Sequence, residues 1–171
     1  MLLNLKATYM ETAVELQVLA SFEVEVKKVI TLEEFVAQNR DTFQSIHPGL
    51  VSRNFLNPCS VDIGTVLQIE ILQCSSPMHY HQCMKYLSEQ GGIFLGPLAI
   101  ILAWEHREKF PIEKWVLSMD EIIHLYRDQD GGYRMPQVRR TEMANLYGFS
   151  LANVQNVLGS DSCLLLVRKK S

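Results

Sequence analysis

Cysteine is scarce in this sequence and is not arranged in close pairs. The 171 residues include only four cysteines, Cys59, Cys74, Cys83 and Cys163, and no two of them have Cys-x-x-Cys spacing. A structural zinc site needs closely spaced pairs of ligands, and a disulfide scaffold is a short chain rich in cysteine. The spacing argues against both classes, and we interpret the cysteines as buried or half-buried free thiols.

The sequence also lacks a strong excess of one charge and a long apolar run. The net charge is -3, and basic residues are scattered apart from Arg139-Arg140 and residues 168–170, which argues against nucleic acid as a partner. The longest apolar run, residues 92–104, contains Pro97 and is shorter than the ~18 residues of a membrane span. The first nine residues do not resemble a secretory signal. We therefore expect a cytoplasmic protein with no membrane partner.

The composition that remains is that of a globular domain. Apolar residues make up 47% of the chain and charged residues 20%, which is typical of a protein with a packed core. The length fits one domain. We expect residues 1–64 to form an N-terminal strand–helix extension and residues 65–171 to form the core.

Alternation with a period of two predicts long strands. From Val14 to Val26 every second residue is apolar and the others are polar, apart from Leu19. This pattern predicts a half-buried strand with one apolar face. Its length exceeds the usual ~5–6 residues, so we expect a bend near Ala20. Residues 65–72 alternate in the same way, and the apolar run 163–167 predicts a central strand.

Helix-start signals occur at three places. The Thr-Leu-Glu-Glu sequence at residues 31–34 is a capping box and predicts a short helix. Ser76, followed by proline, predicts the start of a second helix over residues 78–90. Gly96, also followed by proline, predicts a third helix over residues 98–109, whose first half is apolar and should be buried.

The last third of the chain predicts a strand, a hairpin, a loop and a closing strand. The strand is Trp115–Met119, the hairpin turn is Arg127–Tyr133, the irregular loop is 143–159 and the closing strand is Cys163–Val167. Together these elements predict an α+β fold, with an antiparallel sheet, two packed helices and a central C-terminal strand.

This order of elements resembles the C-type-lectin-like fold. Trp115-Val-Leu117 is similar to the Trp-bearing strand of such domains, and residues 156–169 are similar to their closing segment. The resemblance implies that the closing strand pairs with the first strand and that the long loop forms a ligand face. The triplets with which sugar-binding members hold calcium are missing: Met135-Pro-Gln137 and Leu158-Gly-Ser160 stand nearest to them and lack enough oxygen ligands. Calcium-dependent sugar binding is therefore not expected.

A second resemblance covers more of the chain. Residues 22–169 are similar to an abundant family of uncharacterised bacterial proteins, many from uncultured lineages. The matching pieces are residues 31–35, 67–91, 110–112, 132–138 and 164–169. In that family the stretch before the last strand differs greatly among members, as in binding proteins that are diversified at their ligand face. The family implies no activity and no cofactor.

Three short motifs resemble metal sites but lack the ligands that such sites need. His79 and Cys83 share a helix face, but His81 points away from it, and two ligands make a weak site. His106 has no histidine four residues away, as a zinc-protease helix requires. Residues 128–131 resemble the start of a calcium loop, but the glutamate expected at residue 139 is an arginine. No metal, cofactor or catalytic residue is predicted.

A polar set with two aromatic residues is the predicted ligand-binding site. Tyrosine, arginine and asparagine are good contact residues because they combine contact area with hydrogen-bonding groups. The set lies on the hairpin return and the loop that follows, where an ordinary surface loop is the alternative interpretation. Its members are Tyr133, Arg134, Gln137, Arg139, Arg140, Glu142, Asn145, Tyr147, Asn153, Gln155 and Asn156.

Three functions remain open at this point. The first is a non-enzymatic module that binds a protein or a small ligand through residues 134–156, which requires the polar set to converge on one exposed face. The second is a hydrolase or transferase in which His79, Cys83 or His106 meet in a deep pocket. The third is a structural homo-oligomer, such as a homodimer, in which the strand over residues 14–26 pairs across a two-fold axis.

Overall fold

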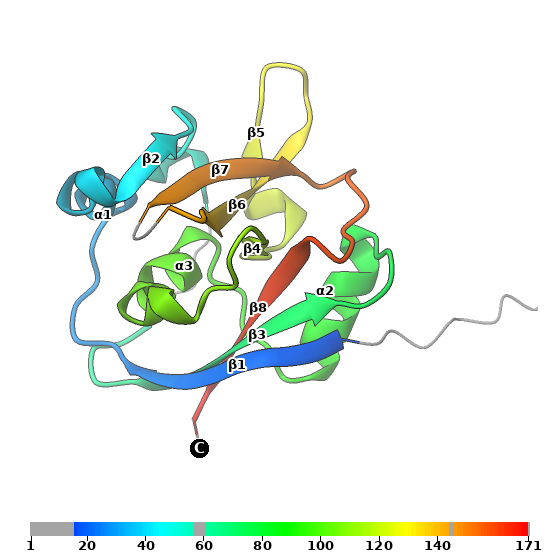
Figure 1. The fold of residues 1–171 in the computed structure, drawn as a ribbon, viewed down its shortest axis with the longest axis horizontal. Helices are drawn as coiled ribbons and strands as arrows, with labels where there is room; N and C mark the ends of the chain where they lie inside the picture. The colour runs from blue at the N-terminus through cyan, green and yellow to red at the C-terminus, as the bar shows by residue number, and fades with distance from the viewer. Residues whose placement is uncertain (1–15, 57–60, 144–145, 171) are drawn as a thin grey trace, which may run out of the picture.

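The structure, a computed structural model, describes residues 16–56, 61–143 and 146–170. Over these residues the chain forms eight strands, three α-helices and four 3-10 helices (Figure 1). The strands are β1 (Leu16–Glu25), β2 (Phe43–Ile46), β3 (Val66–Cys74), β4 (Trp115–Leu117), β5 (Tyr126–Arg127), β6 (Tyr133–Arg140), β7 (Tyr147–Asn153) and β8 (Ser162–Lys169). The helices are α1 (Leu32–Gln38), η1 (Arg40–Thr42), η2 (Ser52–Asn54), α2 (Tyr80–Glu89), α3 (Pro97–Ala103), η3 (Trp104–Lys109) and η4 (Ile122–His124).

All eight strands belong to one mixed sheet. Its order is β1-β3-β8-β4-β6-β7-β2, and β5 pairs with β6. The β4–β8 and β2–β7 pairs are parallel and the other pairs are antiparallel. The predicted purely antiparallel sheet is therefore wrong: β8 lies between two strands that run in opposite directions and can be antiparallel to only one of them. The predicted central position of the C-terminal strand is confirmed.

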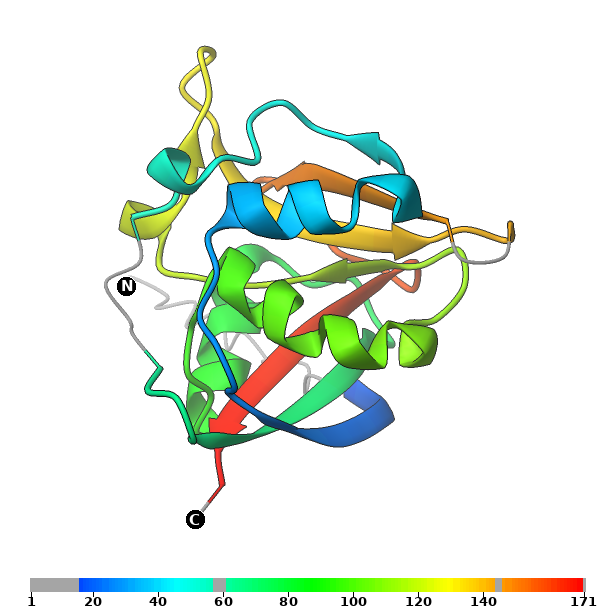
Figure 2. The ribbon, with the colours of Figure 1, turned by 90° about the vertical axis from the view of Figure 1, so that its left-hand side faces the viewer.

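The sheet has a buried core on each face. The first core contains Phe22, Phe35, Leu67, Ile69, Ile71, Ile100, Trp104, Val138, Tyr147, Phe149, Cys163, Leu165 and Val167. The second core contains Leu72, Cys74, Cys83, Leu87, Leu117, Met135, Ala152, Leu164 and Leu166. Figure 2 shows α1 and α3 on the same side of the sheet, where both contribute to the first core. The predicted helices α2 and α3 both pack on the sheet, and they cover opposite faces of it.

A bulge in β1 moves its apolar residues from one face to the other. The register with β3 shifts between Val18 and Ala20, so that Leu19 is the extra residue. Phe22 therefore points into the first core, whereas Leu16 packs against the second core. The predicted bend near Ala20 coincides with this bulge. The predicted single apolar face along the whole strand is wrong, because a one-residue shift reverses the direction of every side chain beyond it.

The three predicted helices exist, with two altered boundaries. The third, predicted over residues 98–109, is an α-helix only to Ala103 and continues as the 3-10 helix η3. At α1 the Thr31 hydroxyl accepts the Glu34 amide at 3.1 Å, and the Glu34 carboxylate accepts the Thr31 amide, which confirms the capping box. The second helix starts at Tyr80 rather than after Ser76, because Met78 and Leu158 exchange backbone hydrogen bonds of 2.8 Å. That bridge keeps the chain extended before α2.

The region predicted as an irregular loop, residues 143–159, contains strand β7. This strand lies between β6 and β2, and its Tyr147 and Phe149 are buried in the first core. The described part of the predicted N-terminal extension is built into the same sheet, since β1 and β2 form its two edges. The chain before and after residue 64 therefore shares one sheet.

Candidate functional site

One row of residues crosses four neighbouring strands on the second-core face of the sheet. Trp115 of β4 is paired with Arg139 of β6, Arg139 with Gly148 of β7, and Gly148 with Ser45 of β2. Directly paired residues place their side chains on the same face, at roughly 5 Å spacing. The same face carries Leu117 and the second core further along, under α2. The row itself lies beyond this helix, where the sheet face is open.

The open part of this face contains a hollow of about 400 Å³, which we name the open-face hollow. Its floor is at Gly148, since a glycine between Arg139 and Ser45 leaves the space that a side chain would fill. A Cβ atom at residue 148 would stand 3.3 Å from the Ser45 Oγ and 3.9 Å from the Trp115 ring. The hollow is lined by Gln44, Ser45, Glu113, Trp115, Arg139, Thr141, Glu142, Met143 and Gly148.

Arg139 is held firmly at one side of the hollow. Its guanidinium forms an ion pair with Glu113 and lies 5.7 Å from the centroid of the Trp115 ring. Its Nε is buried and has no hydrogen-bond partner among the described residues. Both partners of the ion pair are partly exposed, with 37% of the Arg139 and 35% of the Glu113 side chain accessible. The arginine is therefore a wall of the hollow that is fixed through its Nη2 by Glu113.

Glu113 has a backbone conformation that is uncommon for a residue with a side chain. Its φ angle is +59°, and it is the one non-glycine residue with positive φ in the described part of the chain. The conformation is fixed from two sides: the Glu113 amide donates to the Arg140 carbonyl at 2.8 Å, and the Glu113 carboxylate accepts the Glu142 amide at 2.9 Å. Strained residues of this kind concentrate at functional sites.

The connection between β6 and β7 forms the opposite rim. The Thr141 hydroxyl lies within hydrogen-bonding distance of the Met143 and Leu146 carbonyls. Glu142 and Met143 are exposed beside it, and both line the hollow. The rim therefore places a carboxylate and a thioether beside the Trp115 and Arg139 side chains.

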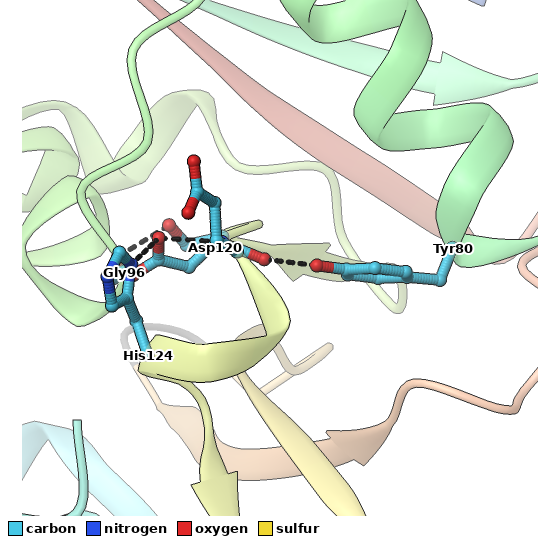
Figure 3. Close-up of polar contacts among 6 residues, drawn as sticks. Tyr80, Gly96, Asp120 and His124 are labelled. Carbon is cyan, nitrogen blue, oxygen red and sulfur yellow. Dashed lines mark hydrogen bonds and ion pairs between the residues drawn. The ribbon is translucent and has the colours of Figure 1, made fainter. Parts of the chain in front are cut away.

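A second polar cluster surrounds Asp120, which follows β4 (Figure 3). Only 1% of Asp120 is exposed, and its carboxylate accepts the Glu121 amide at 2.8 Å and lies 3.1 Å from the His124 Nδ1. The Tyr80 hydroxyl donates to the Asp120 carbonyl at 2.5 Å. Burial raises the pKa of Tyr80 to about 12, and the nearby Asp120 and Glu121 carboxylates add to this shift.

The Asp120 cluster connects three elements of the fold. Tyr80 begins α2, His124 ends η4, and Gly96 caps α3 directly beside the Asp120 carboxylate. Ser118 adds a hydrogen bond of 2.5 Å from its hydroxyl to the Gly96 carbonyl. A buried carboxylate with these partners ties helix ends to the sheet, which is a structural role.

The predicted polar set does not come together on one face. Arg139 and Glu142 line the open-face hollow. Arg140, the next residue on β6, points to the other face, where its guanidinium donates to the Glu108 carbonyl at 2.5 Å. Tyr147 is 2% exposed and donates to the Arg107 carbonyl at 3.2 Å, so it belongs to the core. Burial raises the pKa of Tyr147, against the effect of the Arg140 and Arg107 charges.

The remaining described members lie near the opposite end of β6 and β7. Arg134 donates to the Asp128 carboxylate at 2.5 Å and fixes the β5–β6 hairpin. Desolvation raises the pKa of Asp128, but the hydrogen bonds from Arg134 and the Gly132 amide outweigh it and lower the pKa overall. Tyr133, Asn153, Gln155 and Asn156 lie at this same end, Gln137 lies in the middle of β6, and Asn145 lies outside the described residues.

The residues considered for an enzyme lie on different sides of the sheet. His79 caps α2 and stacks on His81, with 5.9 Å between the ring centroids. His106 is in η3, where its ring lies 4.6 Å from that of Phe22 in the first core. Cys83 is buried in the second core beneath α2. The pocket predicted for a hydrolase or transferase requires two or more of these side chains to meet. His106 and Cys83 pack against different cores and so do not meet, whereas His79 and Cys83 both belong to the start of α2.

The buried thiols are poor nucleophiles. Burial raises the pKa of Cys74 to about 11 and the pKa of Cys83 and of Cys163 to about 12. A thiol with such a pKa carries almost no thiolate at neutral pH. These three cysteines are free, as predicted, whereas Cys59 lies outside the described residues.

Sequence reasoning missed most of the open-face hollow. Glu113, Trp115, Gly148 and Ser45 were not proposed as site residues. One signal was available: the alternation of Tyr147, Phe149 and Leu151 with Gly148 and Ser150 is a strand pattern. A glycine within a strand marks a bulge or a place where something approaches the backbone closely.

The described residues lack two features that would point to a function. No helix in this part of the chain is long and apolar enough to cross a membrane. No group of three or more histidine, cysteine, aspartate or glutamate side chains in the same part is arranged to hold a metal ion. Comparison of the chain with protein-family models, curated proteins and solved structures found no match.

Proposed function

We propose that this protein is a non-enzymatic binding module and that the open-face hollow is its binding site. The observation that carries the proposal is the row of paired residues Trp115, Arg139, Gly148 and Ser45. In this row the glycine opens a space between the Trp115 ring, the ion pair of Arg139 and the Ser45 hydroxyl. Ligand sites combine such contact surface with a few fixed polar groups. The strained backbone at Glu113 supports the proposal.

The size of the hollow limits the ligand. A volume of about 400 Å³ is at the lower end of the ~300–1,000 Å³ typical of small-molecule sites. The hollow therefore suits a small polar molecule or a single side chain of a protein partner. The proposal keeps Arg139 and Glu142 from the polar set and replaces the predicted loop site by a site on the sheet. It does not depend on a C-type-lectin-like relation, which stays a resemblance.

The two tryptophans of the chain allow a direct test. Trp115 lies in the hollow, whereas Trp104 is on the other face, where its indole donates to the Asn39 carboxamide at 2.8 Å. In a ¹⁵N-labelled protein each indole gives one signal. We expect at least one compound in a panel of amino acids, monosaccharides, nucleotides, organic acids and amines to shift the Trp115 signal and leave the Trp104 signal in place.

A matched pair of variants locates the binding. Gly148→Val fills the floor of the hollow, and Ser150→Val adds a similar side chain two residues further along the same strand face, outside the hollow. Binding should be lost in Gly148→Val and kept in Ser150→Val, with the Trp104 signal reporting an intact fold. A Trp115 signal that no compound moves, or binding that survives Gly148→Val, would contradict the proposed site.

A second candidate function is self-association through β1. This strand is an edge of the sheet, and 53% of Val18 and 38% of Leu19 are exposed on it. Edge strands with exposed apolar residues tend to pair with further strands. The exposed edge supports the hypothesis of a homodimer. It is compatible with the open-face hollow, which lies toward the other edge of the sheet.

A further inference from the structure

The charges around the open-face hollow restrict its ligand more than its size does. Two carboxylates, Glu113 and Glu142, and one guanidinium, Arg139, line it, which gives a formal charge of -1. Glu113 is neutralised by Arg139. The Glu142 side chain makes no ion pair with any described residue, and only its amide is engaged, by Glu113. One carboxylate at the rim therefore has no balancing charge.

An anionic ligand fits this arrangement poorly. The arginine would have to bind it, but the Arg139 Nη2 is already bonded to Glu113 and its Nε is buried, which leaves only Nη1 for such a ligand. Releasing Arg139 from Glu113 would leave a partly buried carboxylate without its partner, which is unfavourable. Glu142 would add repulsion from the rim.

We infer that the open-face hollow recognises an organic cation, a primary ammonium or a guanidinium group, with Glu142 as its charge partner and Trp115 as its aromatic surface. The inference rests on the proposed function and names its ligand class. Indole is the best aromatic partner for a cation. The protein already shows this chemistry, because the Arg139 guanidinium lies against the same ring and is paired with a carboxylate. The cation can belong to a free amine or to a lysine or arginine side chain of a partner.

Simple probes test the charge requirement. We propose titrating ¹⁵N-labelled protein with butylammonium and methylguanidinium chloride and, as matched controls, with 1-butanol and sodium acetate. The Trp115 indole signal should shift with both cations, saturate at millimolar concentration and move little with the controls, because exposed ion pairs and cation–π contacts are each weak. Glu142→Gln should weaken binding by about threefold or more, and so should added salt. Glu121→Gln, an exposed glutamate outside the hollow, should not.

A second arm distinguishes the two sources of the cation. A capped pentapeptide with one central lysine is compared with butylammonium. Tighter binding of the peptide assigns the hollow to a protein side chain, and tighter binding of the amine assigns it to a small molecule; both outcomes support recognition of a cation.

The inference would be overturned if acetate or butanol shifted the Trp115 signal and the two cations did not. The proposed binding site would still stand in that case, because a ligand would bind there. Cation binding that persists in Gly148→Val would also overturn the inference, because the cation would then lie elsewhere on the surface. If neither these probes nor the wider panel moves the signal, the proposed function fails together with the inference.

Discussion

Gly96 and Asp120 show how strongly one residue can restrict another in this fold. Gly96 caps α3 with a φ angle of +53°, a conformation that an L side chain adopts only with strain. A Cβ atom at this position would stand 2.9 Å from the Asp120 Oδ2. Asp120 is itself fixed by Glu121 and His124 and is almost completely buried. The glycine is therefore required both by its backbone and by its neighbour.

The first prediction is that Gly96→Ala lowers the free energy of unfolding by about 2–3 kcal/mol. Strain of a backbone with φ +53° and ψ -135°, outside the left-handed helical region, accounts for about 1–2 kcal/mol, and the rest comes from displacing the buried carboxylate. Urea unfolding of the two proteins measures the difference.

Gly91→Ala is the matched control for this prediction. Gly91 also has a positive φ, +72°, but nothing lies within 4 Å of its missing Cβ. We expect this variant to lose only about 1 kcal/mol, from backbone strain alone. Equal losses at the two glycines would show that the contact with Asp120 contributes nothing.

At the scale of elements, the features that could be predicted from the sequence are those formed by residues close together in the chain. The capping box of α1 was predictable because Thr31 and Glu34 are three residues apart and complete the motif by themselves. The bulge in β1 was foreseen as a bend, since Leu19 interrupts the alternation, but its effect on the side-chain directions depends on the pairing with β3. Gly148 within a strand pattern was a signal for part of the open-face hollow, but its row as a whole was not predictable, because Ser45 and Trp115 meet only through the strand order.

Helix α1 is tied to η2 by one carboxylate. Glu33 accepts the Ser52 amide at 2.8 Å and the Ser52 hydroxyl at 2.5 Å, and this hydroxyl accepts the Leu32 amide at 3.1 Å. The hydrogen bond from the Ser52 hydroxyl lowers the pKa of Glu33 below its ordinary value of 4.5, against the opposing effect of desolvation. The ionised carboxylate is therefore the form that holds the two helices together.

The second prediction concerns the pH dependence of this tie. The pKa of Glu33 is lower in the folded than in the unfolded state, so its contribution to stability is complete well above pH 4.5 and decreases as the pH falls through the lowered value. Ser52→Ala removes the main cause of the shift. The difference in free energy of unfolding between wild type and Ser52→Ala should be larger at neutral pH than in acid. This difference should be small at every pH, because Glu33 is exposed.

Urea unfolding at several pH values measures this difference, and Glu33→Gln provides the control. In the Glu33→Gln background the Ser52→Ala substitution should have an effect that no longer depends on pH. A difference between wild type and Ser52→Ala that stays constant from neutral pH into acid would contradict the role assigned to Glu33.

At the scale of the whole molecule, the two faces and the two edges of the sheet serve different purposes. The two cores cover the two faces, and the open-face hollow is a place where the second face is left uncovered. The edges are β1 and β2, and they differ in length: ten residues in β1 and four in β2. Of these two edges, only β1 is long enough to pair along its length with a strand of another copy, and it carries the exposed Val18 and Leu19.

The third prediction is that the protein self-associates weakly through β1. A strand pair between two copies buries less than the ~1,200 Å² of a standard stable interface, so we expect dimers only at high protein concentration. Sedimentation analysis over a concentration series should show the dimer for wild type and its loss in Val18→Lys, because a charge on an edge strand opposes further pairing. Val29→Lys, at a valine that is 55% exposed but outside the strand, should behave as wild type. A monomer at every concentration, or a dimer that Val18→Lys leaves unchanged, would exclude β1 as the dimer contact. The open-face hollow would then be the one proposed interaction site that remains.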